Sequence, residues 1–474
     1  MQSFEGKKYY FIGAGGIGMS GLARVLLRSG AKVSGSDKQS GFIVDRLNRI
    51  GADIRIGHMR EWIEAAGDVD VVIVSAAIGS DNPELKYARD KGLRVLKYAQ
   101  MLGNIVEQHC GLAVAGTHGK SSTSGWAAFM LDKLGLEPNY IVGADIRQLQ
   151  GSSGVGSGNM FVVEACEYDR SFLNIRPNIA VVTNIDLDHL DYYTGLDDII
   201  SAFSEFLAGV KPGGKIILNS DDPNTPALIK AYKERQHTFG RREAEILTFG
   251  ITNKADYQAA NLRLVDGTYS FEMCYDGYVA GEIHLEIPGL HNVYNCLAAI
   301  AMLATNDVDM SDLVGVAGQF TGIDRRLMVL AEREGIKVLD DYAHHPTEIR
   351  ASISAIRQMY KPERLICVFQ PHQYSRTRFL LEDFARSFEN CDLVIVPEIY
   401  FVRDTVESTK TVCAEDLVER IHACGGQAEF IKSFTGILSY LKSHINSGDV
   451  VVTMGAGDIW KVANDYIQWL RTGD

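Results

Sequence analysis

The stretch V-A-G-T-H-G-K-S-S-T at positions 114–123 constrains the fold of this chain more than any other feature. An apolar run at residues 112–115 leads into it, and a helical pattern begins near Ser122. A strand, a glycine-flanked Lys-Ser pair and a helix in this order are typical of a loop that binds phosphate through backbone N–H groups and the helix N-terminus. Lys120 is the expected contact to the β- and γ-phosphates, and the Ser121 hydroxyl is the expected Mg²⁺ ligand.

The loop departs from the usual spacing, because Val114 stands where the common pattern has its first glycine. We interpret it as a shortened variant. The alternative is a chance Gly-Lys-Ser in a surface turn, which the strand before it and the helix after it disfavour.

Length and composition bound the remaining possibilities. A chain of 474 residues is too long to fold around a single hydrophobic core, and a typical size of about 150 residues per domain suggests three domains. The formal charge of −13, without a long Lys/Arg run, argues against a nucleic-acid partner. Eight cysteines without a C-x-x-C pair indicate reduced thiols in the cytoplasm, and no stretch of about 18 apolar residues predicts a membrane span. The boundaries we expect are 1–104, 105–319 and 320–474.

The first unit carries a glycine-rich turn between a strand at 8–12 and a helix at 19–29. A second strand at 32–36 is followed by an acidic residue, as in dinucleotide-binding folds. The pattern predicts a Rossmann-like parallel sheet. It leaves two ligands open, NAD and a UDP-sugar, since either presents a pyrophosphate. The candidate binding residues are Gly13, Gly15, Gly16, Gly18, Ser36 and Asp37.

The other two units also read as α/β domains. The second contains the phosphate loop and a strand-rich insertion at about 255–288, which predicts a central P-loop ATPase-like domain. The third alternates strands with helices, including an expected helix at 379–388, and predicts a second Rossmann-like sheet. Sites in such sheets lie at the carboxyl ends of the strands.

Two polar residues follow strands that should lie beside the phosphate loop. Glu164 ends the strand at 160–165, and His189 lies in D-L-D-H-L-D after the strand at 179–184. A carboxylate and an imidazole there could bind a second Mg²⁺. Alternatively, Glu164 caps a loop and His189 is a surface residue.

Two strand ends of the third unit carry His, Tyr and Arg side chains, in D-D-Y-A-H-H-P (340–346) and Q-P-H-Q-Y-S-R-T-R (370–378). Such a cleft suits a substrate with a carboxylate, which Arg can clamp. The two consecutive histidines could instead cap the following helix. Arg325-Arg326 could be an ion-paired hinge or could meet the nucleotide.

Together these motifs resemble the ATP-dependent Mur ligases of peptidoglycan synthesis, and the resemblance extends over nearly the whole chain. The motifs that carry it are G-A-G-G-I-G-M-S-G, S-A-A-I-G-S-D-N-P-E, A-G-T-H-G-K-S-S-T, E-A-C-E-Y-D-R-S-F-L, T-N-I-D-L-D-H-L-D, G-L-H-N-V-Y-N-C-L-A-A, D-D-Y-A-H-H-P-T-E, F-Q-P-H-Q-Y-S-R-T-R and G-A-G-D-I.

The resemblance implies domains for UDP-sugar, ATP and amino acid, in that order. It implies that ATP converts the carboxylate of UDP-N-acetylmuramate to an acyl phosphate, which L-alanine then attacks. Two Mg²⁺ ions are expected, with Mn²⁺ as a substitute. It also implies a cytoplasmic enzyme that is a monomer or a weak homodimer.

The resemblance assigns roles to residues at the matching positions. The expected nucleotide-binding residues are Gly116, Thr117, His118, Gly119, Lys120, Ser121, Ser122, His291, Asn292, Asn295, Arg326 and Asp341. Ser121, Glu164 and His189 are the expected metal ligands. Tyr342, His344, His372 and Arg376 are expected around the carboxylate and the amine, and the expected catalytic residues are Lys120, His189, His344 and Arg376.

Several positions depart from the family pattern. Ser121 replaces a frequent Thr, Gln373 and Tyr98 stand where Arg is common, and the segment 401–404 is atypical. These departures leave open whether the acceptor is alanine or the tripeptide of a recycling ligase. More distant alternatives are a folylpolyglutamate synthase, an NAD-dependent oxidoreductase and a nucleotide-switched binding module.

Overall fold

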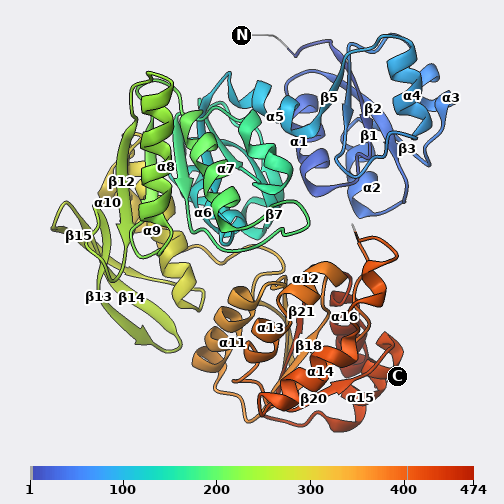
Figure 1. Cartoon of the computed structure of the whole chain (residues 1–474), viewed down its shortest axis with the longest axis vertical. Helices are drawn as coiled ribbons and strands as arrows, with labels where there is room; N and C mark the ends of the chain where they lie inside the picture. Colours follow the sequence, from blue (N-terminus) through green and yellow to red (C-terminus); the bar gives the residue numbers. More distant parts are fainter. Residues whose placement is uncertain (1–3, 403, 474) are drawn as a thin grey trace.

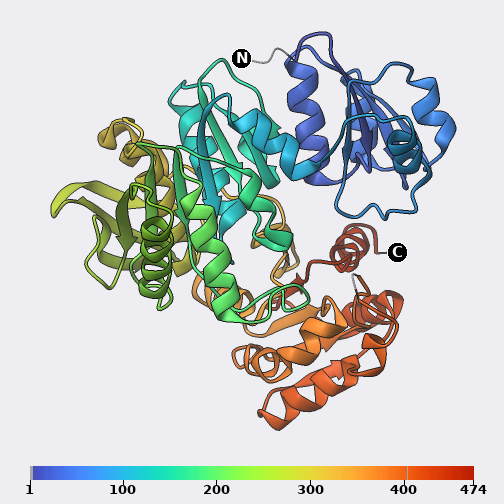
Figure 2. The ribbon, with the colours of Figure 1, turned by 45° about the horizontal axis from the view of Figure 1, so that its top comes forward.

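The computed structural model describes residues 4–402 and 404–473, which fold into three domains with one sheet each (Figure 1). The N-terminal domain is blue, the central domain runs from cyan to yellow, and the C-terminal domain is orange to red. Figure 2 shows the same three lobes from a second direction. Among the described residues, no helix combines the length and the apolar character needed to cross a membrane.

The N-terminal domain has the predicted parallel sheet, in the order β3-β2-β1-β4-β5. Its strands are β1 (Lys8–Ile12), β2 (Lys32–Asp37), β3 (Asp53–Ile56), β4 (Val71–Val74) and β5 (Val95–Lys97). Its helices are α1 (Ile17–Arg28), α2 (Phe42–Arg49), α3 (Arg60–Ala65), α4 (Pro83–Asp90) and α5 (Tyr98–Val106). The strand order reverses at β1, where the glycine-rich turn lies and where such sheets bind ligands. Residue 104 falls inside α5, so a helix connects the first two sheets.

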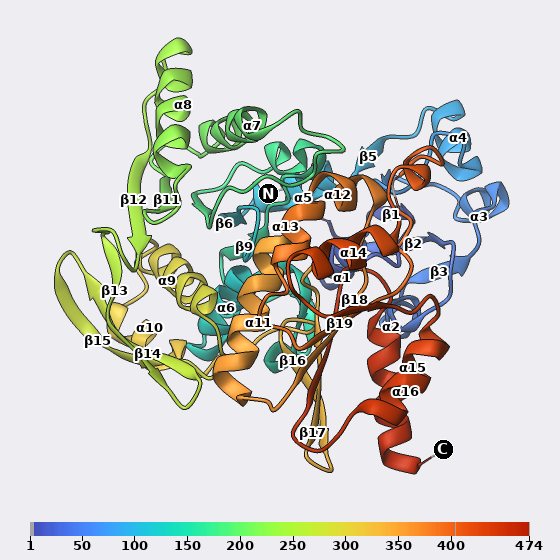
Figure 3. The same cartoon turned by 60° about the horizontal axis from the view of Figure 1, so that its bottom comes forward.

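The central domain has a ten-stranded sheet, ordered β15-β14-β13-β12-β11-β10-β6-β9-β7-β8. Its strands are β6 (Cys110–Ala115), β7 (Asn139–Ile146), β8 (Gly151–Gly154), β9 (Met160–Glu164), β10 (Ile179–Val182), β11 (Lys215–Asn219), β12 (Glu245–Gly250), β13 (Tyr257–Val265), β14 (Thr268–Tyr275) and β15 (Tyr278–His284). The expected insertion at 255–288 is the antiparallel part β13–β15, seen in Figure 3 at the edge of the sheet.

The strands of the central sheet direct successive side chains to opposite faces. Helices cover both of these faces. Leu112 and Val114 of β6 pack with residues of α6 (Lys120–Lys133) and α9 (Leu290–Ala304). Ala113 and Ala115 face the opposite core, which includes residues of α7 (Leu196–Ala208) and α8 (Thr225–Thr238). One further α-helix of the central domain, α10 (Met310–Ala317), precedes the C-terminal domain.

The C-terminal sheet has the order β16-β17-β21-β18-β19-β20, parallel except for β16. Its strands are β16 (Met328–Arg333), β17 (Ile336–Asp341), β18 (Leu365–Phe369), β19 (Leu393–Val396), β20 (Ala428–Phe430) and β21 (Val450–Met454). Its helices are α11 (Pro346–Tyr360), α12 (Tyr374–Phe379), α13 (Leu381–Arg386), α14 (Ala414–Ala423), α15 (Phe434–His444) and α16 (Trp460–Thr472).

Two expected helix boundaries were wrong. The helix after the phosphate loop begins at Lys120 rather than near Ser122, so the lysine itself lies in the first turn. The helix expected at 379–388 is the shorter α13, and an additional helix, α12, precedes it and meets it at Leu380. Leu380 has φ −108°, outside the helical range, because the chain turns there.

Candidate active site between the three domains

The phosphate loop connects β6 to α6 and has a backbone that needs glycine at two positions. Gly116 has φ +134° and Gly119 has φ +81°, in the region that favours glycine. A Cβ at Gly119 would collide with Oδ1 of Asn295, and one at Gly116 would collide with Oγ1 of Thr183. The loop is therefore packed against β10 and α9. Its position leaves the first-turn N–H groups of α6 at the open side of the loop.

Lys120 turns back over the loop that precedes it. Its ammonium donates to the carbonyls of Gly116 (2.6 Å) and Thr117 (2.9 Å) and pairs with Glu167 at 2.9 Å. Burial by itself would lower the pKa of Lys120, but Glu167 raises it above its usual value. The side chain is therefore a fixed positive charge at the point where the loop would meet a phosphate.

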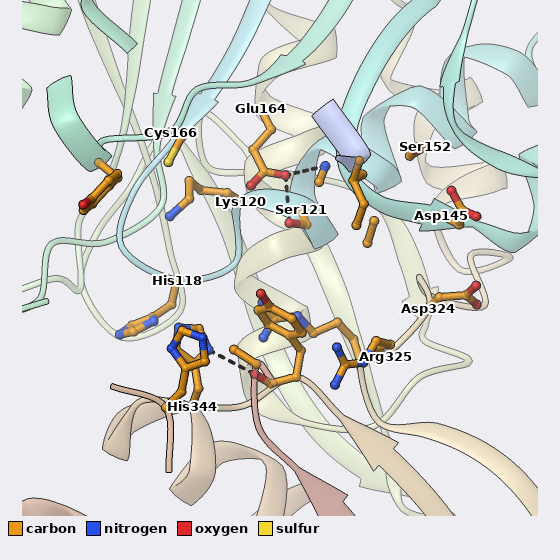
Figure 4. A pocket seen from close by; sticks show the side chains of 18 of the residues that line it. His118, Lys120, Ser121, Asp145, Ser152, Glu164, Cys166, Asp324, Arg325 and His344 are labelled. Atoms are coloured by element: carbon orange, nitrogen blue, oxygen red, sulfur yellow. Dashed lines mark hydrogen bonds between the residues drawn. The ribbon is translucent and has the colours of Figure 1, made fainter. Parts of the chain in front are cut away.

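The Ser121 hydroxyl donates to Oε2 of Glu164 over 2.7 Å, and the same oxygen accepts from the backbone N–H of Gly143 (2.7 Å). Figure 4 shows Lys120, Ser121 and Glu164 on one wall of the cavity, with His118, Arg325 and His344 across from them. Hydroxyl and carboxylate oxygens are the ligands that Mg²⁺ prefers.

His189 has the properties of a ligand rather than of a surface residue. Its backbone is left-handed, with φ +55°, and its Nε2 lies 3.6 Å from Oε1 of Glu167. Its Nδ1 is buried and has no hydrogen-bond partner among the described residues. Burial lowers the pKa of His189, so the ring is held neutral. A neutral imidazole with an unpaired nitrogen fits the expected role in holding Mg²⁺.

A buried carboxylate from α11 joins three of the expected site residues. Glu348 lies 3.3 Å from Nδ1 of His118, 3.3 Å from Nη1 of Arg326, and 3.2 Å from Nδ1 of His344. Burial would raise the pKa of Glu348, but Arg326 and His344 lower it well below its usual range. Burial would also lower the pKa of His118, but hydrogen bonds to Asp186 and Glu348 raise it to about 9. The cluster crosses from the central to the C-terminal domain.

His344 is oriented by its own loop. Its Nδ1 lies 3.0 Å from the carbonyl oxygen of Tyr342, which can only accept a hydrogen bond. Nδ1 therefore carries a proton. Nε2 is the nitrogen at which the ring can gain or lose its other proton.

One cavity of about 570 Å³ is lined by residues of all three domains. It brings together many of the expected site residues, namely Thr117, His118, Gly119, Lys120, Ser121, Glu164, His189, Arg326, Tyr342, His344, His372 and Arg376. A second cavity of about 540 Å³ adjoins the other side of the loop. It is lined by nucleotide candidates, some of them shared with the first cavity, namely His118, Gly119, Ser121, Ser122, His291, Asn292, Asn295, Arg326 and Asp341. Gly116 is not among the residues of the described chain that line either cavity.

The two cavities meet at the phosphate loop, so a nucleotide in the second would direct its phosphates toward the first. His291 borders the second cavity, and burial lowers its pKa to about 4, which keeps the ring neutral. Asp341 accepts from the backbone N–H groups of Leu327 (2.9 Å) and Ala343 (2.6 Å). Burial raises its pKa to about 6.

The glycine-rich turn lies outside the lining of both cavities, and its role in binding the sugar nucleotide stays a prediction. Gly13, Gly15, Gly16 and Gly18 are not among the described residues that line either cavity. Ser36 is fully buried and donates to Oε2 of Glu84 (2.6 Å), while Asp37 accepts from the N–H of Gly15 (2.7 Å). The Asp37 side chain thus stabilises the turn, whereas that of Ser36 bonds to α4. The N-terminal domain instead lines the first cavity with residues of α1 and α2, namely Ile17, Ser20, Arg24, Phe42, Ile43, Arg46 and Leu47.

Comparison with known proteins decides the family. Sequence models of the Mur ligase family catalytic domain, the Mur ligase middle domain and the Mur ligase glutamate ligase domain match residues 8–109, 114–303 and 325–457. The UDP-N-acetylmuramate–L-alanine ligase of Caldanaerobacter subterraneus is 40% identical and is aligned over 98% of this chain and 97% of its own. The enzyme of the same name from Geobacter sulfurreducens is 39% identical, with 98% of each chain covered. The chain belongs to the Mur ligase family.

Solved structures agree with this assignment. The UDP-N-acetylmuramate–alanine ligase of Thermotoga maritima superimposes with a TM-score of 0.81, at 25% identity, over 98% of this chain and 100% of its own. A murein peptide ligase from Psychrobacter arcticus gives a TM-score of 0.71 at 22% identity, which is a likeness of fold. Members of the family use ATP, typically with Mg²⁺.

The positions at which this Mur ligase departs from the family pattern have structural roles. The ring of Tyr98 packs on the glycine-rich turn, where a Cβ at Gly18 would lie 2.9 Å from its hydroxyl oxygen. Gln373 is 2% exposed and has a left-handed backbone, with φ +73°. Asp404 accepts from the N–H groups of Tyr374 (2.6 Å) and Ser375 (3.2 Å) and so caps α12. Arg403 of the segment 401–404 lies outside the described residues.

Four carboxylates of this Mur ligase were missed as site residues by the sequence analysis: Glu167, Asp186, Asp188 and Glu348. All four lie within motifs that were recognised, so proximity to Glu164, His189 and His344 in the sequence was the available signal. Their partners, however, come from other segments of the chain, and for Asp186, Asp188 and Glu348 they include residues of another domain. Such pairings depend on the domain arrangement.

Proposed function

We propose that this Mur ligase adds L-alanine to the carboxylate of UDP-N-acetylmuramate and converts ATP to ADP and phosphate. The observation that carries the proposal is the match to two relatives of that name at 40% and 39% identity over almost the full chain. The three-domain cavity supports it, because a ligase must bring a sugar nucleotide, a triphosphate and an amino acid to one place.

The proposed nucleotide site is the second cavity together with the phosphate loop. Residues 116–122 would hold the phosphates, with Lys120 as the fixed cation, and His291, Asn292 and Asn295 would border the base. Arg326 and Asp341 would reach the nucleotide from the C-terminal domain. Ser121, Glu164 and His189 would hold two Mg²⁺ ions, which supply positive charge between two anions.

The proposed acceptor site is the first cavity. Arg376 and His372 approach each other, with Nη1 of the guanidinium 3.3 Å from Nδ1 of the imidazole. We assign them, with Tyr342, to the carboxylate and the incoming amino acid. The amine of alanine must lose a proton before it can attack an acyl phosphate. We assign the acceptance of this proton to Nε2 of His344, because Nδ1 is hydrogen-bonded to the carbonyl of Tyr342.

The cavity walls would also keep water away from the reaction intermediate. An acyl phosphate hydrolyses in water, so the intermediate requires a closed site. The C-terminal domain provides one wall through Tyr342, His344 and Arg376, and its docking on the central domain closes the space. The same proposal includes the domain limits 1–104, 105–319 and 320–474. It also includes a cytoplasmic location, where ATP is available, and a protein that is a monomer or a weak homodimer.

The decisive experiment measures phosphate release with UDP-N-acetylmuramate and each of four acceptors: alanine, glycine, serine and the tripeptide. We expect alanine to give the fastest release, and a faster rate with the tripeptide would reassign the chain to a recycling ligase. The variant Lys120→Ala should lose ADP formation while the protein still binds the sugar nucleotide. Amide formation by this variant at the rate of the parent enzyme would refute the proposed phosphate site.

A further inference from the structure

Two histidines and one aspartate converge outside the proposed Mg²⁺ set. His118 belongs to the phosphate loop, Asp186 follows β10, and His345 precedes α11. One nitrogen or oxygen atom from each lies within 4.8 Å of the others. Nε2 of His118 and Nδ1 of His345 lie 3.3 Å and 3.8 Å from the same oxygen, Oδ2 of Asp186. Ligand atoms about 2.0 Å from a tetrahedral metal ion lie about 3.3 Å apart, so these spacings suit a common ion.

The second nitrogen of each imidazole already has the partner that metal-binding histidines use. Nδ1 of His118 lies 3.3 Å from Oε1 of Glu348, and Nε2 of His345 lies 3.2 Å from the carbonyl oxygen of Leu187. In metal sites, a carboxylate or a carbonyl at this position fixes the ring and directs the other nitrogen at the ion. Here both remaining nitrogens face the Asp186 carboxylate, and a bound ion would displace the proton that His118 shares with Asp186.

Two carboxylates, Asp186 and Glu348, contact the ring of His118. Glu348 also pairs with Arg326 and His344, so Asp186 is the carboxylate that would neutralise the ion. Thr347 donates to Oδ2 of Asp186 through its hydroxyl (2.7 Å) and to Nδ1 of His345 through its N–H (3.3 Å). The second of these bonds is long, and it is the one that an ion would replace.

We propose that His118, Asp186 and His345 form a binding site for one divalent transition-metal ion of the zinc type. The site shares no residue with Ser121, Glu164 and His189. Two imidazoles and one carboxylate are ligands that zinc accepts readily, whereas Mg²⁺ prefers oxygen ligands. Three protein ligands also leave one tetrahedral position for water.

The site joins two domains, so a bound ion would affect their movement relative to each other. His118 and Asp186 belong to the central domain and His345 to the C-terminal domain, so a bound ion would hold the two together. If the proposed ligase function is correct, product release requires the domains to separate. Zinc should then lower kcat more than it changes KM.

The test uses the full-length protein and measures binding rather than turnover, so its outcome does not depend on the ligase assignment. Titration with Zn²⁺ by calorimetry, in excess Mg²⁺, should give one ion per chain. Co²⁺ should produce the visible absorption of a four-coordinate site with nitrogen and oxygen ligands. His345→Gln should weaken binding at least tenfold, whereas the exposed His237→Gln should leave it unchanged.

A second variant guards against misfolding. Asp186→Asn keeps the size of the side chain and should also weaken binding at least tenfold, with circular dichroism spectra matching those of the parent protein. Absence of a Zn²⁺ heat signal in the parent protein would overturn the proposal. It would also fail if His345→Gln bound zinc as tightly as the parent, or if only Glu164→Gln abolished binding.

Discussion

The carboxylate of Asp188 in the central domain accepts two hydrogen bonds from the guanidinium of Arg376 in the C-terminal domain. Its Oδ1 lies 2.9 Å from Nη2 and 3.1 Å from Nε. The side chains are only 8% and 6% exposed. Burial would raise the pKa of Asp188, but Arg376 lowers it well below its usual range. The pair is therefore ionised and belongs to the arrangement in which the two domains are docked.

Removing one charge of this pair should affect turnover more than global stability. Asp188→Asn leaves the Arg376 guanidinium buried without a counter-ion, a change that costs about 3–5 kcal/mol in buried pairs. Because the pair crosses a domain boundary, this cost opposes docking. We expect kcat to fall at least tenfold while the thermal midpoint of unfolding changes little. Asp198→Asn is the control, since Asp198 pairs with Arg170 within the central domain, and its kcat should stay near that of the parent.

The glycine at the start of α6 offers a matched test of the phosphate loop. Gly119→Ala places a Cβ against Oδ1 of Asn295 at φ +81°. Gly135→Ala introduces a Cβ at a similar angle, φ +72°, with no atom within 4 Å. Both variants should lose about 1 kcal/mol of stability from backbone strain. We expect only Gly119→Ala to weaken ATP binding as well, and calorimetric titration with ATP measures this. Equal ATP affinity in the two variants would contradict our placement of the loop.

Glu348 is expected to position groups on both sides of the reaction. Glu348→Gln keeps the size of the side chain but removes the charge that faces His118, Arg326 and His344. We expect kcat to fall 10- to 100-fold with little change in the KM for the sugar nucleotide, because no residue of the N-terminal domain contacts Glu348 through a hydrogen bond or ion pair in the described chain. The exposed Glu382→Gln serves as the control. Restoration of activity in Glu348→Asp would support a role of the charge over a role of shape.

The raised pKa of Asp341 leads to a prediction about how stability depends on pH. Burial raises its folded-state pKa from 3.8 to about 6, so the folded state binds this proton more tightly than the unfolded state. The stabilising contribution is therefore present below about pH 4 and is lost as the pH rises to about 6. Its full size is about 3 kcal/mol. Asp341→Asn should lack this loss, so its stability relative to the parent should increase between pH 4 and pH 6. Urea unfolding at several pH values measures the difference, and a parallel pH dependence in both proteins would refute the assigned pKa.

Local sequence patterns predicted elements that are stabilised by their own residues. The strand at 8–12 has the predicted bounds, because it combines a strong apolar and aromatic pattern with a clear end at the glycine-rich turn. β16 was not expected, since it lies at the sheet edge and pairs only with β17. Its conformation depends on that partner. The break at Leu380 is likewise set by packing of α12 and α13 rather than by a proline or glycine.

The sequence by itself determined the three α/β domains, the phosphate loop and the family, because glycine spacing, strand–helix alternation and ordered motifs are properties of contiguous residues. Only the tertiary structure decided which groups face each other. It placed Glu348 among His118, Arg326 and His344 and paired Asp188 with Arg376. It also showed that residues of α1 and α2, and not the glycines, form the part of the cavity lining that belongs to the N-terminal domain. The physical reason is that the partners of the Glu348–His118 and Asp188–Arg376 pairs are more than 100 residues apart and lie in different domains. They interact only when the domains are docked, and no local pattern encodes that arrangement.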